Sequence, residues 1–79
     1  MKLEELRSQI AGILEIDPSE LTADSGPGAI PTWDSMAALS IVSLIDDLYQ
    51  GELSAEETEK FTSFGAIASF ARKVGLAED

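Results

Sequence analysis

The residue of greatest chemical interest in this chain is a serine that follows a loop rich in glycine and proline. Ser35 comes directly after Pro31–Asp34 and directly before Met36, where a long apolar segment begins. The chain contains no cysteine and no histidine. A serine nucleophile normally needs a nearby base, usually histidine, to become reactive. We therefore interpret Ser35 as a hydroxyl that another enzyme modifies, not as a catalytic nucleophile.

Other kinds of chemistry have little support in the sequence. A serine–lysine arrangement would need a buried lysine, whereas Lys60 and Lys73 lie in short amphipathic segments. The adjacent carboxylates of Asp46 and Asp47 lack the spacing of a calcium-binding loop. The Gly-Pro-Gly stretch at 26–28 lacks the lysine and hydroxyl residue of a phosphate-binding loop. We expect no catalytic activity and no metal site.

Charge and composition restrict the possible partners and location. The chain has 79 residues, with 15 acidic and 5 basic side chains and a net charge of −10. Such a surface repels nucleic acid and anionic membranes and attracts basic partners. No segment reaches the roughly 20 apolar residues that a membrane-spanning helix needs, and the charged N-terminus has no apolar signal core. We expect one domain over residues 1–79, monomeric and cytoplasmic, without membrane insertion.

The hydrophobic periodicity predicts helices and no strands. Apolar residues three or four apart predict a helix over 3–16, followed by a long connection over 17–33 that contains a short helical turn at 19–21. A second helix should run from Asp34 or Ser35 to about Tyr49. A short third helix, capped by Ser54, should end near Phe61. Thus far the pattern gives two long helices and one short one.

A fourth helix completes the predicted fold. Thr62 or Ser63 should cap it, its apolar residues repeat from Phe64 to Val74, and Gly75 should end it. The tail at 76–79 should be frayed. The prediction is an all-α fold, a small up-down bundle of three main helices and one short helix.

The second helix has an unusual distribution of apolar residues. On a helical wheel, Met36 and Leu39 fall on the polar arc, within about one turn of Ser35. A serine or aspartate at a helix start is often only a cap. Exposed apolar residues beside it are not needed for capping, and they favour an interface. Contact of Leu39 with the preceding loop is the alternative.

These residues together resemble the acyl carrier proteins, in the wider group that includes peptidyl carriers. The resemblance covers nearly the whole chain: an N-terminal helix, a long loop, Asp34-Ser35-Met36 opening the second helix, a short third helix and a closing fourth. The family motif is usually Asp-Ser-Leu, so Met36 is a conservative departure. Trp33 before the aspartate is similar to stand-alone carriers of specialised or cell-surface pathways.

The resemblance implies a cofactor and a set of partners. Ser35 would carry 4′-phosphopantetheine, transferred from coenzyme A by a phosphopantetheinyl transferase, and the thiol of that arm would hold acyl or aminoacyl cargo as a thioester. Asp34 would help to orient the transferase and its magnesium. Trp33, Met36 and Leu39, with Asp46 and Asp47, would form the partner interface.

The remaining partners implied by the resemblance are an acyl-loading ligase or transferase and downstream synthase enzymes with basic docking patches. The first half of the second helix is less acidic than in fatty-acid carriers, since Ala37 and Ser40 are neutral. This favours a specialised lipid, polyketide or cell-surface pathway. A peptidyl carrier remains an alternative, and an acidic adaptor without a covalent cofactor is another. An aliphatic core around Ile41 and Ile45 could admit an acyl chain or could be ordinary packing.

Overall fold

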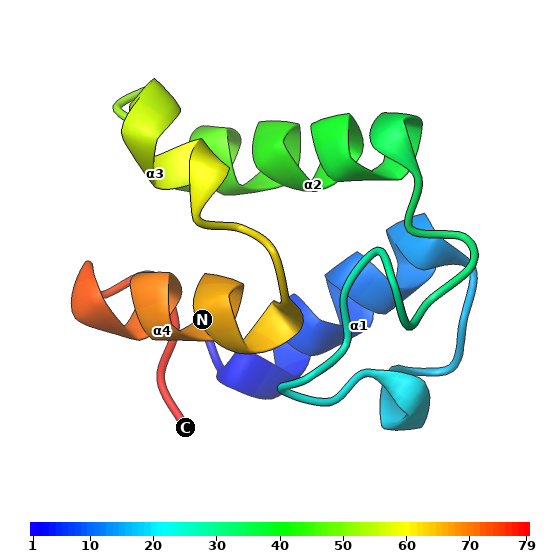
Figure 1. Cartoon of the computed structure of the whole chain (residues 1–79). Coiled ribbons are helices and arrows are strands. Elements are labelled where there is room, and N and C mark those ends of the chain that lie inside the picture. The colour runs from blue at the N-terminus through cyan, green and yellow to red at the C-terminus, as the bar shows by residue number, and fades with distance from the viewer.

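The computed structural model describes all residues from Met1 to Asp79 and contains helices without a sheet. The elements are α1 (Leu3–Leu14), a 3-10 turn η1 (Pro18–Glu20), α2 (Ser35–Leu48), α3 (Ala55–Glu59) and α4 (Phe64–Lys73). In Figure 1, α1 runs in the opposite direction to α2 and α4, and the short α3 connects α2 to α4. The predicted all-α bundle of three main helices and one short helix is confirmed. None of its helices combines the length and the apolar character needed to cross a lipid bilayer.

Aliphatic side chains from the three long helices form the core. Each helix presents apolar residues three or four apart on one face, which is the spacing that brings them together. The largest fully buried side chains come from α1, α2, α4 and the long loop: Leu6, Ile10, Leu14, Leu21, Ile41, Ile45 and Ile67. This core holds the start of α2 at one end of the bundle and α3 at the other (Figure 1).

Two helices end earlier than the sequence predicted. α1 ends at Leu14 because Glu15 adopts a left-handed conformation (φ 59°), which allows the Ile16 N–H to donate to the Ala11 carbonyl at 3.1 Å. This is the hydrogen-bond pattern of a Schellman motif. Because Pro18 disfavours helical geometry at the residue before it, the sequence predicted that the helix ends near Ile16. The left-handed conformation of Glu15 ends it two residues earlier, at Leu14. α3 likewise ends at Glu59, two residues before the predicted position.

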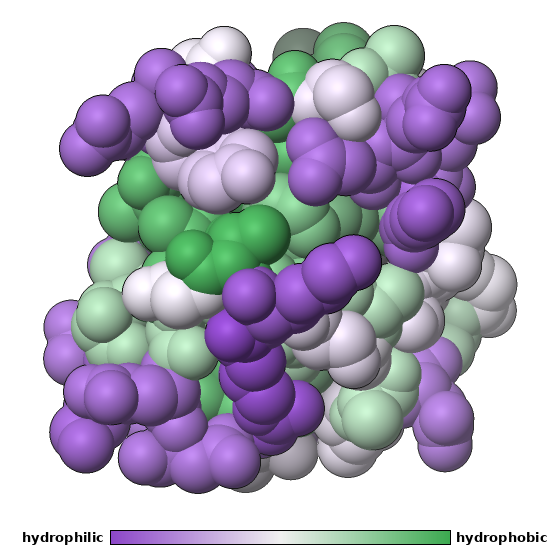
Figure 2. Space-filling model, turned by 90° about the vertical axis from the view of Figure 1, so that its left-hand side faces the viewer, coloured by the Kyte–Doolittle hydropathy of each residue, from purple (hydrophilic) through white to green (hydrophobic).

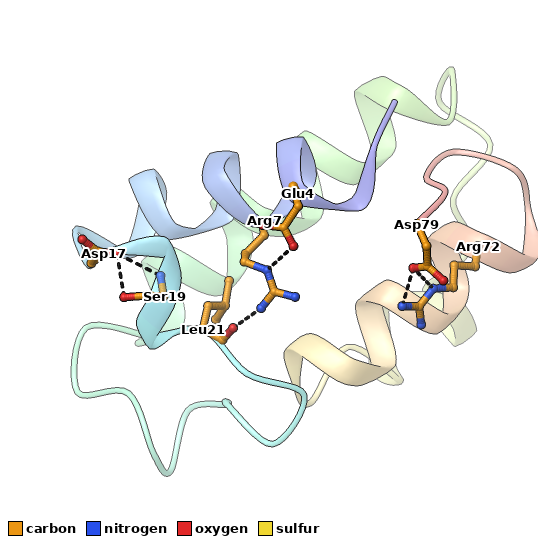
Figure 3. A network of polar contacts seen from close by, with 7 residues as sticks. All are labelled: Glu4, Arg7, Asp17, Ser19, Leu21, Arg72 and Asp79. Atoms are coloured by element: carbon orange, nitrogen blue, oxygen red, sulfur yellow. Dashed lines mark hydrogen bonds and ion pairs between the residues drawn. The ribbon is translucent and has the colours of Figure 1, made fainter.

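The long loop between α1 and α2 is attached to the beginning of α4. The Phe64 N–H donates to the Ser25 carbonyl at 2.7 Å, and the Gly65 N–H donates to the Ala23 carbonyl at 2.9 Å. The Arg7 guanidinium donates to the Leu21 carbonyl (Figure 3) and lies 4.9 Å from the centre of the Phe64 ring. These contacts fix the loop that leads to Ser35.

A second polar contact organises the start of the same loop. Asp17 Oδ1 accepts hydrogen bonds from the Ser19 N–H at 2.9 Å and from the Ser19 hydroxyl at 2.8 Å, as Figure 3 shows. Both hydrogen bonds lower the pKa of Asp17, because both favour the ionised carboxylate. The bond from the Ser19 N–H has the larger effect and the bond from the Ser19 hydroxyl the smaller one. The ionised carboxylate therefore caps η1.

The expectation of a frayed tail is wrong. Ala77 is 5% exposed, and the Leu3 N–H donates to the Glu78 carbonyl at 2.6 Å. Arg72 Nη2 lies 2.8 Å from Asp79 Oδ1 (Figure 3). The tail returns to the N-terminus because its backbone pairs there, a non-local contact that residue types near a chain end do not reveal.

Candidate functional site

The loop before α2 ends with an aspartate that caps the helix. Asp34 has an extended backbone, and its Oδ1 accepts a hydrogen bond from the Ala37 N–H at 2.9 Å. The sequence allowed either Asp34 or Ser35 to be the cap. The structure assigns this role to Asp34, which places Ser35 at the first position of the helix.

The Ser35 side chain is consequently free. Ser35 is exposed, and its hydroxyl forms no hydrogen bond with the protein. The hydroxyls of Ser54 and Ser63, which cap α3 and α4, both accept backbone hydrogen bonds. Of the serines at the helix starts, Ser35 alone presents an uncommitted oxygen to solvent.

Two backbone donors at the start of α2 are also unpaired. The N–H groups of Ser35 and Met36 have no acceptor in the protein, whereas the next N–H, of Ala37, is satisfied by Asp34. Unpaired N–H groups and the positive end of the helix dipole together favour a negatively charged group at a helix start. A phosphate joined to the Ser35 oxygen would meet these donors.

Two shallow hollows flank the Asp34–Ser35 segment. One of about 270 Å³ is lined by Pro27, Trp33, Asp34, Ser35 and Ala38. The other, of about 280 Å³, lies between α1 and α2 and is lined by Ile13, Glu15, Thr32, Asp34, Met36, Ala37 and Ser40. The contributions of Thr32 and Pro27 were missed from the sequence, because loop residues have no period that reveals which way they face. Glu15 was missed because the helix was expected to continue to Ile16, whereas α1 ends at Leu14.

The expectation that Trp33 belongs to a partner interface needs correction. Its side chain is 3% exposed and belongs to the hydrophobic core. The Trp33 N–H also donates to the Ile30 carbonyl at 3.0 Å. The indole therefore anchors the loop directly before Asp34, because a large apolar ring gains most when it is removed from water. Its contribution to the site is to position the two residues that follow.

The exposure of the two apolar residues on the polar arc is confirmed. Met36 is 78% exposed and Leu39 is 69% exposed. The only other exposed large apolar residue is Met1, at 37%. Leu39 therefore does not cover the loop, which was the alternative. Together with Ser35 they form a surface that we call the α2 start surface, consisting of Ser35, Met36 and Leu39.

Asp46 and Asp47 lie at the other end of the same helix. Asp47 is twelve residues after Ser35 (47 − 35), so the helical rise separates the two by about 18 Å. Asp46 is half-buried, and its Oδ1 accepts a hydrogen bond from the Leu53 N–H at 3.3 Å. Asp46 thus holds the α2–α3 connection, and Asp47 is exposed. The structure does not bring these carboxylates together with the α2 start surface.

The comparisons with known proteins add no family to this description. No protein-family model matches the chain, and a search of curated proteins gave no match. The assignment of a function therefore depends on the geometry of the site and on the sequence resemblance.

Proposed function

We propose that this protein is a carrier of acyl or aminoacyl groups, modified at Ser35 with 4′-phosphopantetheine. The observation that carries the proposal is the free Ser35 hydroxyl at the first position of α2, with Asp34 providing the cap. The chain has no thiol of its own, and the bound arm would supply the sulfur for a thioester. The protein itself supplies the Ser35 oxygen as the attachment point and catalyses no step.

The residues of the site fit this cofactor. In the transferase, the Ser35 oxygen would form a bond to the phosphate of the pantetheine arm as the diphosphate bond of coenzyme A breaks. Adenosine 3′,5′-bisphosphate would leave, and a base of the transferase would take the hydroxyl proton. The N–H groups of Ser35 and Met36 are available to the resulting phosphodiester. The hollow beside Trp33 and Ala38 offers the first atoms of the arm an apolar wall. The carboxylate of Asp34 would orient the transferase and its magnesium.

The proposed partners follow from the surface. Met36 and Leu39 would make the apolar contact with the transferase, with a loading ligase or acyltransferase, and with downstream synthases. The net charge of −10 favours partners with basic patches. We place this carrier in the cytoplasm as a monomer, and in a specialised lipid, polyketide or cell-surface pathway. A peptidyl or aminoacyl carrier is the closest variant of the proposal.

The second candidate is an acidic adaptor that binds a basic partner without a covalent cofactor. The exposure of Met36 and Leu39 favours it, because an adaptor would use the same side chains. The two candidates differ in the role of the Ser35 oxygen. In an adaptor, Ser35→Ala leaves partner binding intact, whereas reversing the charges of Asp46 and Asp47 abolishes it.

Intact-mass spectrometry tests the carrier proposal. The folded protein is incubated with a broad-specificity phosphopantetheinyl transferase, magnesium and coenzyme A. We expect a gain of one phosphopantetheinyl group in the wild type and no gain in Ser35→Ala. Ser40→Ala is the matched control, since Ser40 is also exposed on α2, and it should be modified as the wild type is. Absence of a gain in the wild type, or a gain in Ser35→Ala, contradicts the proposal.

A further inference from the structure

A groove between α3 and α4 lies outside the site described above. Its volume is about 340 Å³, and Ser35 is not among its lining residues. From α3 and its end it takes Glu57, Lys60 and Phe61, and from α4 and its end it takes Ala66, Ser69, Phe70, Lys73 and Val74. Both sets follow the three- and four-residue spacing of a helix face. The groove is therefore formed by two helix faces that meet.

The floor of the groove is aromatic and partly accessible. Phe61 and Phe70 are half-buried, and their rings meet edge to face with centroids 5.3 Å apart. Tyr49, directly after the end of α2, extends this contact, with its ring centroid 5.5 Å from that of Phe70. Figure 2 shows the end of the molecule that carries α3, where apolar surface is surrounded by hydrophilic residues. Aromatic edges and faces of this kind favour contact with another apolar or aromatic group.

The charges of the groove differ from those of the whole chain. Of the 5 lysines and arginines, Lys2, Arg7 and Arg72 form ion pairs with Glu78, Glu4 and Asp79. The two that remain (5 − 3) are Lys60 and Lys73, and both line this groove.

The one carboxylate of the groove is already engaged. Glu57 Oε1 accepts a hydrogen bond from the Ser54 N–H at 3.0 Å, as part of the capping box of α3. A protein with a net charge of −10 thus presents two unpaired cations at a single apolar hollow. Charge complementarity points to an anionic occupant with an apolar body.

We propose that the α3–α4 groove binds a small apolar monocarboxylate, with its carboxylate beside Lys60 and Lys73 and its apolar body against Phe61 and Phe70. The volume lies near the lower end of the range of about 300–1,000 Å³ that is typical of small-molecule sites. The proposal is independent of the modification of Ser35, because it uses other residues at the other end of the bundle.

An NMR titration tests the proposal, with phenylpropionate as the probe. Two-dimensional amide spectra of the isotope-labelled full chain are recorded as the probe is added. We expect saturable shifts centred on α3 and α4. Phenylpropionamide has the same shape without the charge, and we expect it to bind about threefold to tenfold more weakly, the range that exposed ion pairs provide.

Variants of the groove provide the second arm. Lys60→Gln combined with Lys73→Gln should weaken phenylpropionate binding by about threefold to tenfold, and Ser69→Asp should weaken it in the same direction. Lys2→Gln is the control for loss of a charge elsewhere and should bind as the wild type does. All these positions are exposed, so dispersed amide spectra should confirm that each variant folds.

Several results would overturn the proposal. These are the absence of saturable shifts, shifts centred on α1 or the start of α2, equal binding of the amide, or undiminished binding by the double lysine variant. Shifts with an acidic aromatic peptide but none with phenylpropionate would also overturn it, because the groove would then be a protein-docking surface.

Discussion

The starts of α2 and α4 share one capping scheme and differ in their accessibility. Asp34 accepts a hydrogen bond from the Ala37 N–H at 2.9 Å, and Ser63 accepts one from the Ala66 N–H at 3.1 Å. In both helices the cap satisfies the third N–H and leaves the first two without an intrahelical partner. The local hydrogen-bond pattern of the two helix starts is therefore the same.

Tertiary contacts make the difference. At α4 the N–H groups of Phe64 and Gly65 donate to loop carbonyls at 2.7 and 2.9 Å, and Phe64 is 2% exposed. At α2 the corresponding N–H groups, of Ser35 and Met36, have no acceptor, and Met36 is 78% exposed. A closed helix start stabilises the fold, whereas an open one is available to an incoming phosphate. The caps of the two helices are therefore alike, and the path of the loop between α1 and α2 determines that the start of α4 is closed and the start of α2 is open.

The largest effect should come from disturbing the closed start of α4. A Cβ at position 65 would lie 2.7 Å from the Ala23 carbonyl oxygen, a backbone atom of the attached loop. We expect Gly65→Ala to lower the free energy of unfolding by about 1–3 kcal/mol, the usual cost of overpacking. Urea denaturation measures it.

A matched glycine variant serves as the control for that prediction. Gly12 lies in α1, and a Cβ there meets no atom within 4 Å. Gly12→Ala should raise the free energy of unfolding by up to about 1 kcal/mol, because alanine favours the helix. Equal stability of Gly65→Ala and the wild type would show that the loop is not held against α4 as described.

The next effect concerns the charge at the open start of α2. Asparagine caps a helix as well as aspartate does, so Asp34→Asn should change the free energy of unfolding by less than about 0.5 kcal/mol. If the carboxylate orients the transferase and its magnesium, the initial rate of phosphopantetheine transfer should fall roughly tenfold. Time-resolved intact-mass spectrometry measures the rate.

A variant with the same change of charge at a remote site controls for the loss of one negative charge. Glu52 is exposed beyond the far end of α2, and Glu52→Gln should be modified at the wild-type rate. Modification of Asp34→Asn at the wild-type rate would reduce the role of Asp34 to that of a cap.

The smallest predicted effect is the difference in the free energy of unfolding between the alanine variants of Ser63 and Ser35. Ser63→Ala removes the cap of α4 and should lower the free energy of unfolding by about 1 kcal/mol. Ser35→Ala removes a hydroxyl without a hydrogen bond and should change it by less than about 0.5 kcal/mol. Thermal or urea unfolding of both variants under the same conditions makes the comparison. A loss in Ser35→Ala as large as that in Ser63→Ala would mean that the Ser35 hydroxyl has a structural partner.

Helical periodicity carried most of the prediction from sequence. The positions of the four α-helices, the cap at Ser54 and the exposure of Met36 and Leu39 were all predicted, because each depends on residues within a few positions of one another. For α4 the sequence left Thr62 and Ser63 as alternatives, and Ser63 is the cap. Local spacing determines which face of a helix a side chain occupies.

Non-local contacts limited the prediction. Trp33 was expected at the surface, and it is buried because the whole loop folds against the core. The pairing of Glu78 with Leu3 joins opposite ends of the chain, and neither end has a pattern that indicates it. Residue types alone also left open whether Asp34 or Ser35 caps α2, since both are favoured at that position.

If Ser35 is the tether point for a phosphopantetheine arm, the modification must be located on this residue. The wild-type protein, modified in the folded state, is digested and its peptides are sequenced by tandem mass spectrometry. We predict that every modified peptide carries the group on Ser35, next to an unmodified Asp34 and Met36. Modification on another serine, such as Ser40 or Ser54, or no modified peptide at all, would contradict the account.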